Sequence, residues 1–324
     1  MISTTAPDTF GPSARRADPA VRRWIARELA QHPPRARSLV ITVWGDAIAP
    51  HGGAVMLSGL IALLAPLRVS ERLARTSVFR LVKEGWLGST RIGRRSLYHL
   101  TDDGARRFEQ AYRRIYATPE VSWGEDWELV IGDGLSAAQR RSLKAELSWE
   151  GFGTIGPGVF GRPARAESTV ARIATALGVD DRIIAVRARD DPQGGCQSLH
   201  AAASKAWDLA GIAAEYRAFL LRFGNVVERF RHCPADARDR HQCFAVRSLL
   251  IHAYRRTLLR DPQLPAALLP LDWPGNAAAA LCRDVYRVTL DGAERHLRKT
   301  LEGPSGALPP VDDAFRRRFG GLET

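Results

Sequence analysis

The chain has 324 residues, of which 45% are hydrophobic, so it can bury more than one core and we expect two or three domains. Its formal net charge of +12 favours a polyanionic partner, nucleic acid first, although an anionic membrane or small ligand fits as well. No apolar run approaches the about 18 residues of a membrane-spanning helix, no signal-peptide core is present, and the four cysteines form no CxxC pair. These features argue against a membrane-spanning or disulfide-stapled protein and predict a cytoplasmic one without a membrane partner.

The N-terminus is predicted to form a polar arm and one helix. Residues 1–17 are rich in Thr, Ser, Pro and Ala, and we expect them to be disordered. Residues 18–34 predict a helix, because Asp18 can cap it, Pro19 fits its first turn and a double proline ends it.

An apolar segment follows at residues 38–67. Its first part predicts a helix broken near Gly45, and the sequence HGG at 51–53 predicts a turn. Residues 54–64 are almost wholly apolar, which predicts a second helix buried against its neighbours.

The stretch SERLARTSVFRLVKEGWL, residues 70–87, predicts an amphipathic helix with Ser70 as its N-cap and Gly85 just past its end. At 100° per residue, one face of this helix is basic and the opposite face is apolar. The basic face carries Arg72, Arg75, Thr76, Phe79 and Lys83. The apolar face carries Ala74, Val78 and Leu81. Taken alone, such a helix is more often a solvated surface than a binding one.

The neighbouring residues favour binding. Residues 86–101 alternate around a tight turn at 92–95, which predicts a β-hairpin with a basic tip. The order helix, helix, turn, helix, hairpin is that of a winged helix-turn-helix, whose third helix enters the major groove of DNA. Residues 68–95 hold eight basic and two acidic side chains, placed on the two elements that would meet DNA. Phe79 can contact a thymine methyl or pack under the wing.

The centre of the chain has a different pattern. Residues 127–189 predict β-α-β-α-β, and the bent middle piece at 153–163 can supply two strands. This order suits a small ferredoxin-like α/β domain. Residues from about 200 to 300 are predicted to be helical, and residues 101–119 predict a capped connector helix.

The expected fold is therefore a mixed, multi-domain α+β protein with an N-terminal winged helix-turn-helix, a central ferredoxin-like domain and a C-terminal helical domain. Its expected parts are an N-terminal arm and helix at 1–37, the winged helix-turn-helix with its connector helix at 38–118, the ferredoxin-like domain at 119–195, the helical domain at 196–310 and a tail at 311–324.

Four stretches carry a resemblance to a known family. They are SLVITVWGDAIAPHGG (38–53), ERLARTSVFRLVKEGWL (71–87), LSWEGFGTIGPGVFGRP (147–163) and HAYRRTLLRDPQLPAALLPLDWPG (252–275). In this order they resemble the PaaX family of transcriptional repressors of phenylacetic acid degradation. The resemblance implies a homodimer that represses a catabolic operon, a central domain similar to the small CRISPR adaptation nucleases, and release from DNA by phenylacetyl-CoA. One departure is Ala253, where family members often carry an acidic residue.

An acyl-CoA effector needs cationic donors for its phosphates and an apolar slot for its acyl group. The candidate ligand-binding residues are Arg162, Lys205, Trp207, His252, Tyr254, Arg255 and Arg256. Taken singly, each such residue is more often a surface ion-pair partner or a core aromatic than a ligand-binding residue.

Other chemistry finds little support. The chain has no P-loop, no GxGxxG that opens a helix and no GxSxG elbow, so we expect no enzyme, no catalytic residue and no cofactor. Asp133 ends the first central strand as a nuclease carboxylate would, but no second carboxylate is evidently paired with it. His232, Cys233, His241 and Cys243 are zinc-ligand types at an unusual spacing, and we expect no metal there.

The sequence therefore predicts a DNA-binding transcriptional repressor that binds a double-stranded operator as a dimer. The predicted DNA-binding residues are Arg72, Arg75, Thr76, Arg80, Lys83, Arg91, Arg94 and Arg95. Two alternatives stay open: a metal-dependent enzyme acting on nucleic acid, and an acyl-CoA-binding protein without specific DNA binding.

Overall fold

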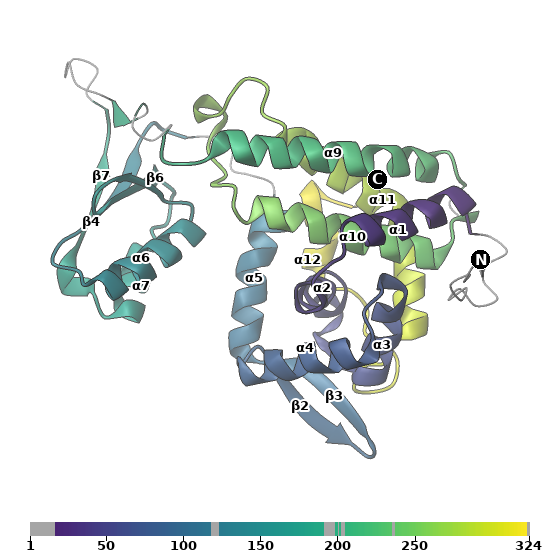
Figure 1. Ribbon diagram of the computed structural model, residues 1–324. Helices are drawn as coiled ribbons and strands as arrows, with labels where there is room; N and C mark the ends of the chain where they lie inside the picture. The colour runs from purple at the N-terminus through teal and green to yellow at the C-terminus, as the bar shows by residue number, and fades with distance from the viewer. Residues whose placement is uncertain are drawn as a thin grey trace, which may run out of the picture. The chain divides into compact units, whose positions relative to one another are not determined.

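The computed structural model describes residues 17–117, 123–190, 205–234 and 237–322, together with residues 198, 199 and 201. The expected disorder of residues 1–17 concerns residues that, except for Ala17, lie outside this part. The chain forms two compact units (Figure 1). The first unit is Met1–Ala117, Ala218–Arg255 and Ala277–Thr324, and the second is Thr118–Arg217 and Arg256–Asn276. The N-terminal region and much of the helical C-terminal region thus share one unit, so packing groups the chain differently from its order in sequence.

The first unit begins with a helical segment that leads to a small sheet. Its elements are α1 (Pro19–Gln31), α2 (Ala36–Val43), β1 (Ala54–Met56), α3 (Leu57–Leu64), α4 (Glu71–Lys83), β2 (Leu87–Ile92), β3 (Arg95–Leu100) and α5 (Asp102–Tyr116). The predicted caps Asp18 and Ser70 are confirmed, because the side chain of each accepts a backbone N–H. The connector helix α5 is capped in the same way by Thr101.

Two details of the segment 38–64 differ from the prediction. The helix does not break at Gly45, because α2 continues as a π-helical turn, Trp44–Ile48, and a 3-10 turn, Ala49–His51. Glycine at this position leaves room for Phe108, whose ring would lie 2.8 Å from a Cβ on Gly45. The second helix begins only at Leu57, because residues 54–56 pair with β3 as a strand.

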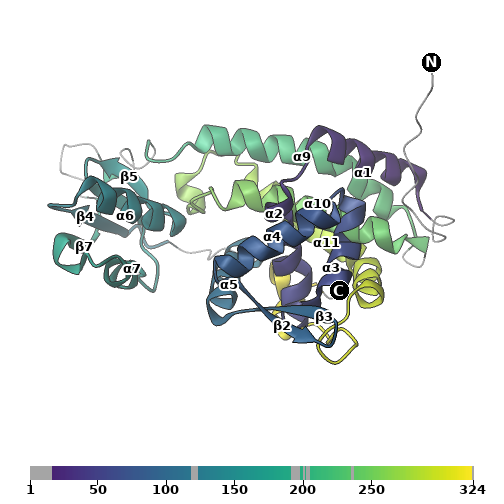
Figure 2. The same cartoon turned by 60° about the horizontal axis from the view of Figure 1, so that its bottom comes forward.

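The small sheet has the order β1-β3-β2 and is antiparallel throughout. Strands β2 and β3 form the predicted hairpin, in which Ile92 pairs with Arg95 across a loop of Gly93 and Arg94. Gly93 has φ +60°, a conformation that glycine adopts without strain, so the tip is a two-residue turn beginning with glycine. The hairpin projects from the first unit beside α4 (Figures 1 and 2).

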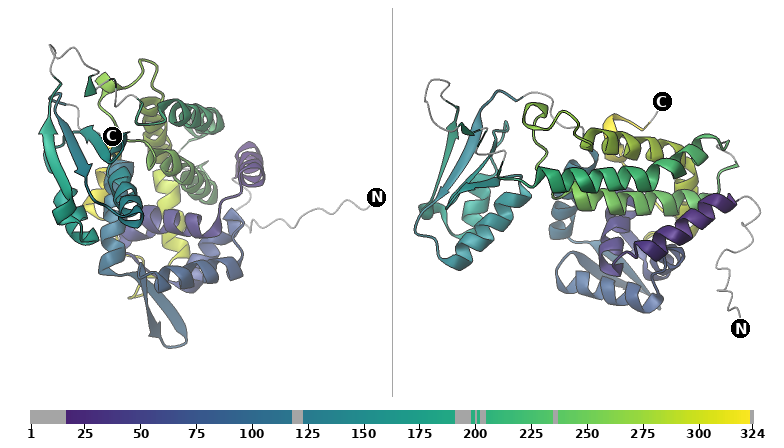
Figure 3. Two further views of the ribbon diagram at one scale, coloured as in Figure 1. Left: turned by 60° about the vertical axis from the view of Figure 1, so that its left-hand side comes forward. Right: turned by 45° about the horizontal axis from the view of Figure 1, so that its top comes forward.

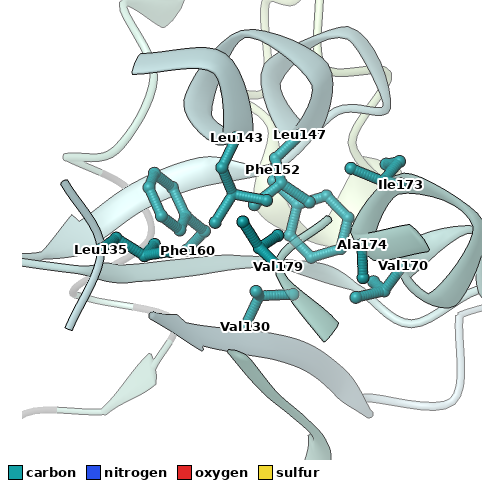
Figure 4. Packing of buried hydrophobic residues seen from close by; sticks show 10 residues of the cluster. All are labelled: Val130, Leu135, Leu143, Leu147, Phe152, Phe160, Val170, Ile173, Ala174 and Val179. Carbon is teal, nitrogen blue, oxygen red and sulfur yellow. The ribbon is translucent and has the colours of Figure 1, made fainter. Parts of the chain in front are cut away.

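The second unit contains the predicted central α/β fold. Its elements are β4 (Trp127–Gly132), α6 (Ala137–Trp149), β5 (Gly153–Gly156), β6 (Val159–Pro163), α7 (Val170–Leu177) and β7 (Ile183–Ala188). The antiparallel order β5-β6-β4-β7 and the succession β-α-β-β-α-β belong to the ferredoxin-like arrangement. Both helices pack on one face of the sheet, where Leu143, Leu147 and Ile173 meet Val130 and Phe160 (Figure 4).

The C-terminal region is helical, as predicted. Its helices are α9 (Leu209–Arg231), α10 (Arg240–Leu258), α11 (Gly275–Thr300) and the short α12 (Asp313–Arg316). Within the first unit, the ring of Phe219 on α9 contacts that of Tyr254 on α10, with ring centroids 5.7 Å apart, and α9 and α10 run side by side (Figure 3). Gly292 of α11 faces Cys243 of α10, whose Sγ would lie 2.5 Å from a Cβ at that position.

A buried ionic cluster connects distant parts of the first unit. Asp46, 2% exposed, lies in the π-helical turn after α2. It pairs with Arg247 of α10 (Oδ2–Nε 3.3 Å) and with Arg318 of the C-terminal segment (Oδ1–Nη1 3.2 Å). Tyr116 of α5 donates to its Oδ1 at 2.6 Å, and Tyr286 of α11 also donates to it. This cluster joins α2, α5, α10, α11 and the C-terminal segment.

A second carboxylate extends the cluster. Glu294 of α11 pairs with Arg247 at 3.1 Å and with His51 Nε2 at 3.1 Å. Burial opposes its charged form, but the hydrogen bond from His51 and the charge of Arg247 outweigh burial and lower the pKa of Glu294 to about 2. This buried carboxylate, which Arg247 and His51 both contact, therefore stays ionised.

Within the described residues, no helix is both long enough and apolar enough to cross a membrane.

Candidate nucleic-acid interface

The predicted basic face of α4 is confirmed as solvent-exposed. The side chains of Ala74, Val78 and Leu81 are buried, together with that of Ser77. Because these residues lie on one side of α4, the opposite side faces solvent. The outward residues Arg72, Arg75, Thr76, Arg80 and Lys83 are all exposed. The helix thus offers a continuous cationic face to a partner.

Two local contacts order this face. Glu71 holds the guanidinium of Arg75 one turn away, with Arg75 Nε 2.8 Å and Nη2 2.7 Å from Glu71 Oε1. Thr76 donates its hydroxyl to the carbonyl of Arg72 at 2.8 Å, which leaves its methyl group to face solvent. The pair Arg75–Glu71 is exposed and therefore weak, so a phosphate or a guanine can displace the carboxylate.

The hairpin adds a second cationic element beside α4. Arg91, Arg94 and Arg95, which lie at or next to its tip, are exposed. Arg95 forms an ion pair with Glu302, which follows the end of α11. We call the five α4 residues and these three arginines the basic surface.

Four arginines of the basic surface are available for a ligand. Arg72, Arg80, Arg91 and Arg94 form no ion pair with any residue that the structure describes. Uncompensated charges on neighbouring elements raise the local potential and attract a polyanion.

The helix α10 binds α2, the helix that packs against α4. α2 packs against α4, and two side chains of α10 bind α2. His252 Nδ1 lies 2.9 Å from Thr42 Oγ1, and Arg255 donates to Ser38 Oγ at 3.2 Å. The predicted ligand residues His252 and Arg255 therefore have structural contacts in the first unit, where Tyr254 is also buried.

The other predicted ligand residues lie in the second unit. Arg162 is 1% exposed and pairs with Glu128 at 2.7 Å, with its guanidinium 4.5 Å from the ring centroid of Phe152. This arrangement makes Arg162 a structural ion-pair residue of the sheet. Trp207 is half-buried against Gly153, whereas Lys205 and Arg256 are exposed. The seven residues are thus divided between the two units.

Neither a zinc site nor a nuclease metal site gains geometric support among the described residues. Cys243 is fully buried, and burial raises the pKa of its thiol to about 12, which disfavours the thiolate that zinc binds. The ring of His241 contacts that of His296 in a tilted arrangement, with ring centroids 4.4 Å apart. Within the described part of the chain, no three His, Cys, Asp or Glu side chains, Asp133 included, come together as a metal site.

Sequence reasoning missed Glu302, which contacts Arg95 of the hairpin from 207 residues away along the chain. Its backbone carbonyl also accepts from the N–H of Met56 at 3.1 Å, which ties the end of α11 to β1. A single sequence gives no signal for such a pair, because nothing local links the two residues.

Comparisons with known proteins cover nearly the whole chain. The family model described as PaaX-like protein matches residues 35–104, the PaaX protein central Cas2-like domain matches residues 120–201, and the PaaX-like protein C-terminal domain matches residues 207–299. The transcriptional repressor PaaX of Escherichia coli (strain K12) is 35% identical over 290 residues, which cover 90% of this chain and 92% of that protein. A solved structure, the uncharacterized protein Rv0674 from Mycobacterium tuberculosis, shares 23% identity and a TM-score of 0.47 over 87% of this chain and 99% of that one.

Proposed function

Because this chain belongs to the PaaX family, we propose that it is a DNA-binding transcriptional repressor of a phenylacetate catabolic operon. The observation that carries this proposal is the basic surface, in which an exposed cationic helix lies beside a cationic hairpin. Its role is regulatory rather than catalytic, as for the E. coli relative named a transcriptional repressor.

In this proposal, α2, α3, α4 and the sheet β1-β3-β2 act as a winged helix-turn-helix. α4 enters the major groove, where one or two of its arginines bind guanine edges through two hydrogen bonds and the others hold phosphates. Arg94 at the hairpin tip reaches the backbone or an adjacent minor groove. A homodimer would place two copies of α4 about 34 Å apart, one turn of DNA, on an inverted repeat.

We further propose that phenylacetyl-CoA releases the protein from its operator. Release requires the effector to bind the DNA-free conformation more tightly than the DNA-bound one, because equal affinity for both shifts nothing. Lys205 and Arg256 have exposed cationic groups suited to the phosphates of CoA. Arg162 would have to break its ion pairs with Glu128 and Glu150 before it could bind a phosphate of CoA.

A gel-shift titration with the protein's own upstream DNA tests the proposal. Arg75→Ala should weaken specific binding by about 1–3 kcal/mol, and Lys83→Ala, if it removes a phosphate contact, should lower the salt dependence by about one charge. Arg140→Ala, an exposed arginine on α6 outside the basic surface, is the matched control and should change neither.

The outcomes distinguish a repressor from an acyl-CoA-binding protein and from a nuclease. If neither α4 variant differs from the control, α4 is a solvated surface helix, and binding of acyl-CoA alone becomes the better function. Loss of the complex with phenylacetyl-CoA, but not with free phenylacetate, supports the effector. If the DNA were instead degraded in the presence of a divalent metal, and Asp133→Ala abolished this degradation, the protein would be a nuclease.

A further inference from the structure

A large apolar side chain lies among the residues of the basic surface, and the charge argument does not use it. Phe79 is 58% exposed, although burying a phenylalanine side chain away from water normally stabilises the folded protein. It projects from the outward face of α4 among Arg72, Arg75 and Lys83, opposite the buried Val78 and Leu81. Its exposure rules out the expectation that the ring packs under the wing.

The neighbouring Lys83 determines which part of the Phe79 ring a partner can contact. Lys83 lies one turn further along α4, and its Nζ is 5.1 Å from the centroid of the Phe79 ring. A cation over one ring face is attracted by the aromatic quadrupole. The ammonium covers one face, which leaves the other face and the edge for a partner.

The chemistry of the surroundings selects that partner. A face with this charge attracts the DNA backbone, but a phosphate has no apolar surface that could bury an aromatic ring. The floor of the major groove carries one distinctive apolar group, the C5 methyl of thymine, and apolar side chains contact it directly. A phenylalanine held among phosphate-binding cations is thus suited to a base edge.

We propose that Phe79 packs against a thymine methyl in each half-site and is a specificity-determining residue of the repressor. The proposal rests on the proposed function, because it requires α4 to lie in the major groove. It adds that the operator carries a thymine at the base pair beneath Phe79. Arginine contacts alone would make the basic surface select guanines only.

Replacement of thymine by deoxyuridine tests the proposal, because deoxyuridine pairs identically but lacks the methyl group. Each thymine of a bound operator fragment is replaced in turn. For the wild-type protein, one replacement per half-site should weaken binding by about fourfold, the effect of one buried methyl-sized group. Phe79→Ala should bind the unmodified operator more weakly and lose this sensitivity at that position alone.

Leu221→Ala is the matched control, because Leu221 is an 81% exposed leucine on α9 that lies outside the basic surface. It should show the wild-type deoxyuridine pattern. The proposal is overturned if no replacement affects the wild type, or if Phe79→Ala keeps the wild-type pattern. A change in sedimentation of Phe79→Ala with that pattern kept would identify the ring as a protein–protein contact. Failure of the proposed function is distinct, since the wild type would then form no specific complex.

Discussion

The buried Asp46 cluster predicts that Arg318→Met strongly destabilises the first unit. Arg318 is 1% exposed and donates to the carbonyls of Asp46 (3.0 Å) and Gly45 (3.3 Å), besides its ion pair with the Asp46 carboxylate. Its guanidinium also lies 3.9 Å from the ring centroid of Tyr116. Methionine can fill the same volume against the ring, but it can make none of these hydrogen bonds.

The expected loss is about 3–5 kcal/mol. Removing one partner of a buried ion pair costs about that much, because the remaining charge stays buried with less compensation. Arg247 still pairs with Asp46 in the variant, so the loss of stability should not exceed this range. Since whole domains are stable by only about 5–15 kcal/mol, the variant should lose a large part of its stability.

Hydrogen exchange of the full chain is the suitable assay, because the two units need not unfold together. Protection should fall in α2, α5 and α11 and stay unchanged in α6 and α7 of the second unit. Arg317→Met is the matched control, since the neighbouring Arg317 is exposed and should change stability by less than about 0.5 kcal/mol. If both variants behaved alike, the cluster would contribute nothing specific and the reasoning would be wrong.

Two further predictions concern pH and the wing. Burial, together with the charges of His241, Arg240 and Arg247, lowers the pKa of His296 to about 3. The unfolded chain therefore binds the proton first, and stability should fall as the pH drops from 6.5 towards 3, by about 2 kcal/mol at pH 5 from this group. Urea unfolding of His296→Phe should show a flatter pH dependence over this window, and an unchanged slope would contradict the assignment. Glu302→Gln should free Arg95 and raise DNA affinity by up to about fivefold at low salt. Titrations at two salt concentrations check this, and weaker binding would mean that Glu302 instead holds the wing in its binding position.

Much of the architecture follows from the sequence alone, because its signals are local. The spacing of apolar residues in α4 determines which face is buried, and the same spacing places Arg72 and Lys83 on the opposite face. Side-chain caps and glycine at positive φ, such as Gly178 after α7, mark helix ends through contacts within a few residues. The central β-α-β-β-α-β order follows from the same short-range patterns.

The tertiary structure decided whatever depends on residues far apart in the chain. β1 is a strand only because β3 supplies its partner, although its own sequence continues an apolar helical run. The predicted ligand residues His252 and Arg162 became structural because α2 and Glu128 supply their partners. Asp46 and Arg318 meet across 272 positions. No local periodicity encodes such pairs, because their energy exists only once the chain has folded and excluded water from them.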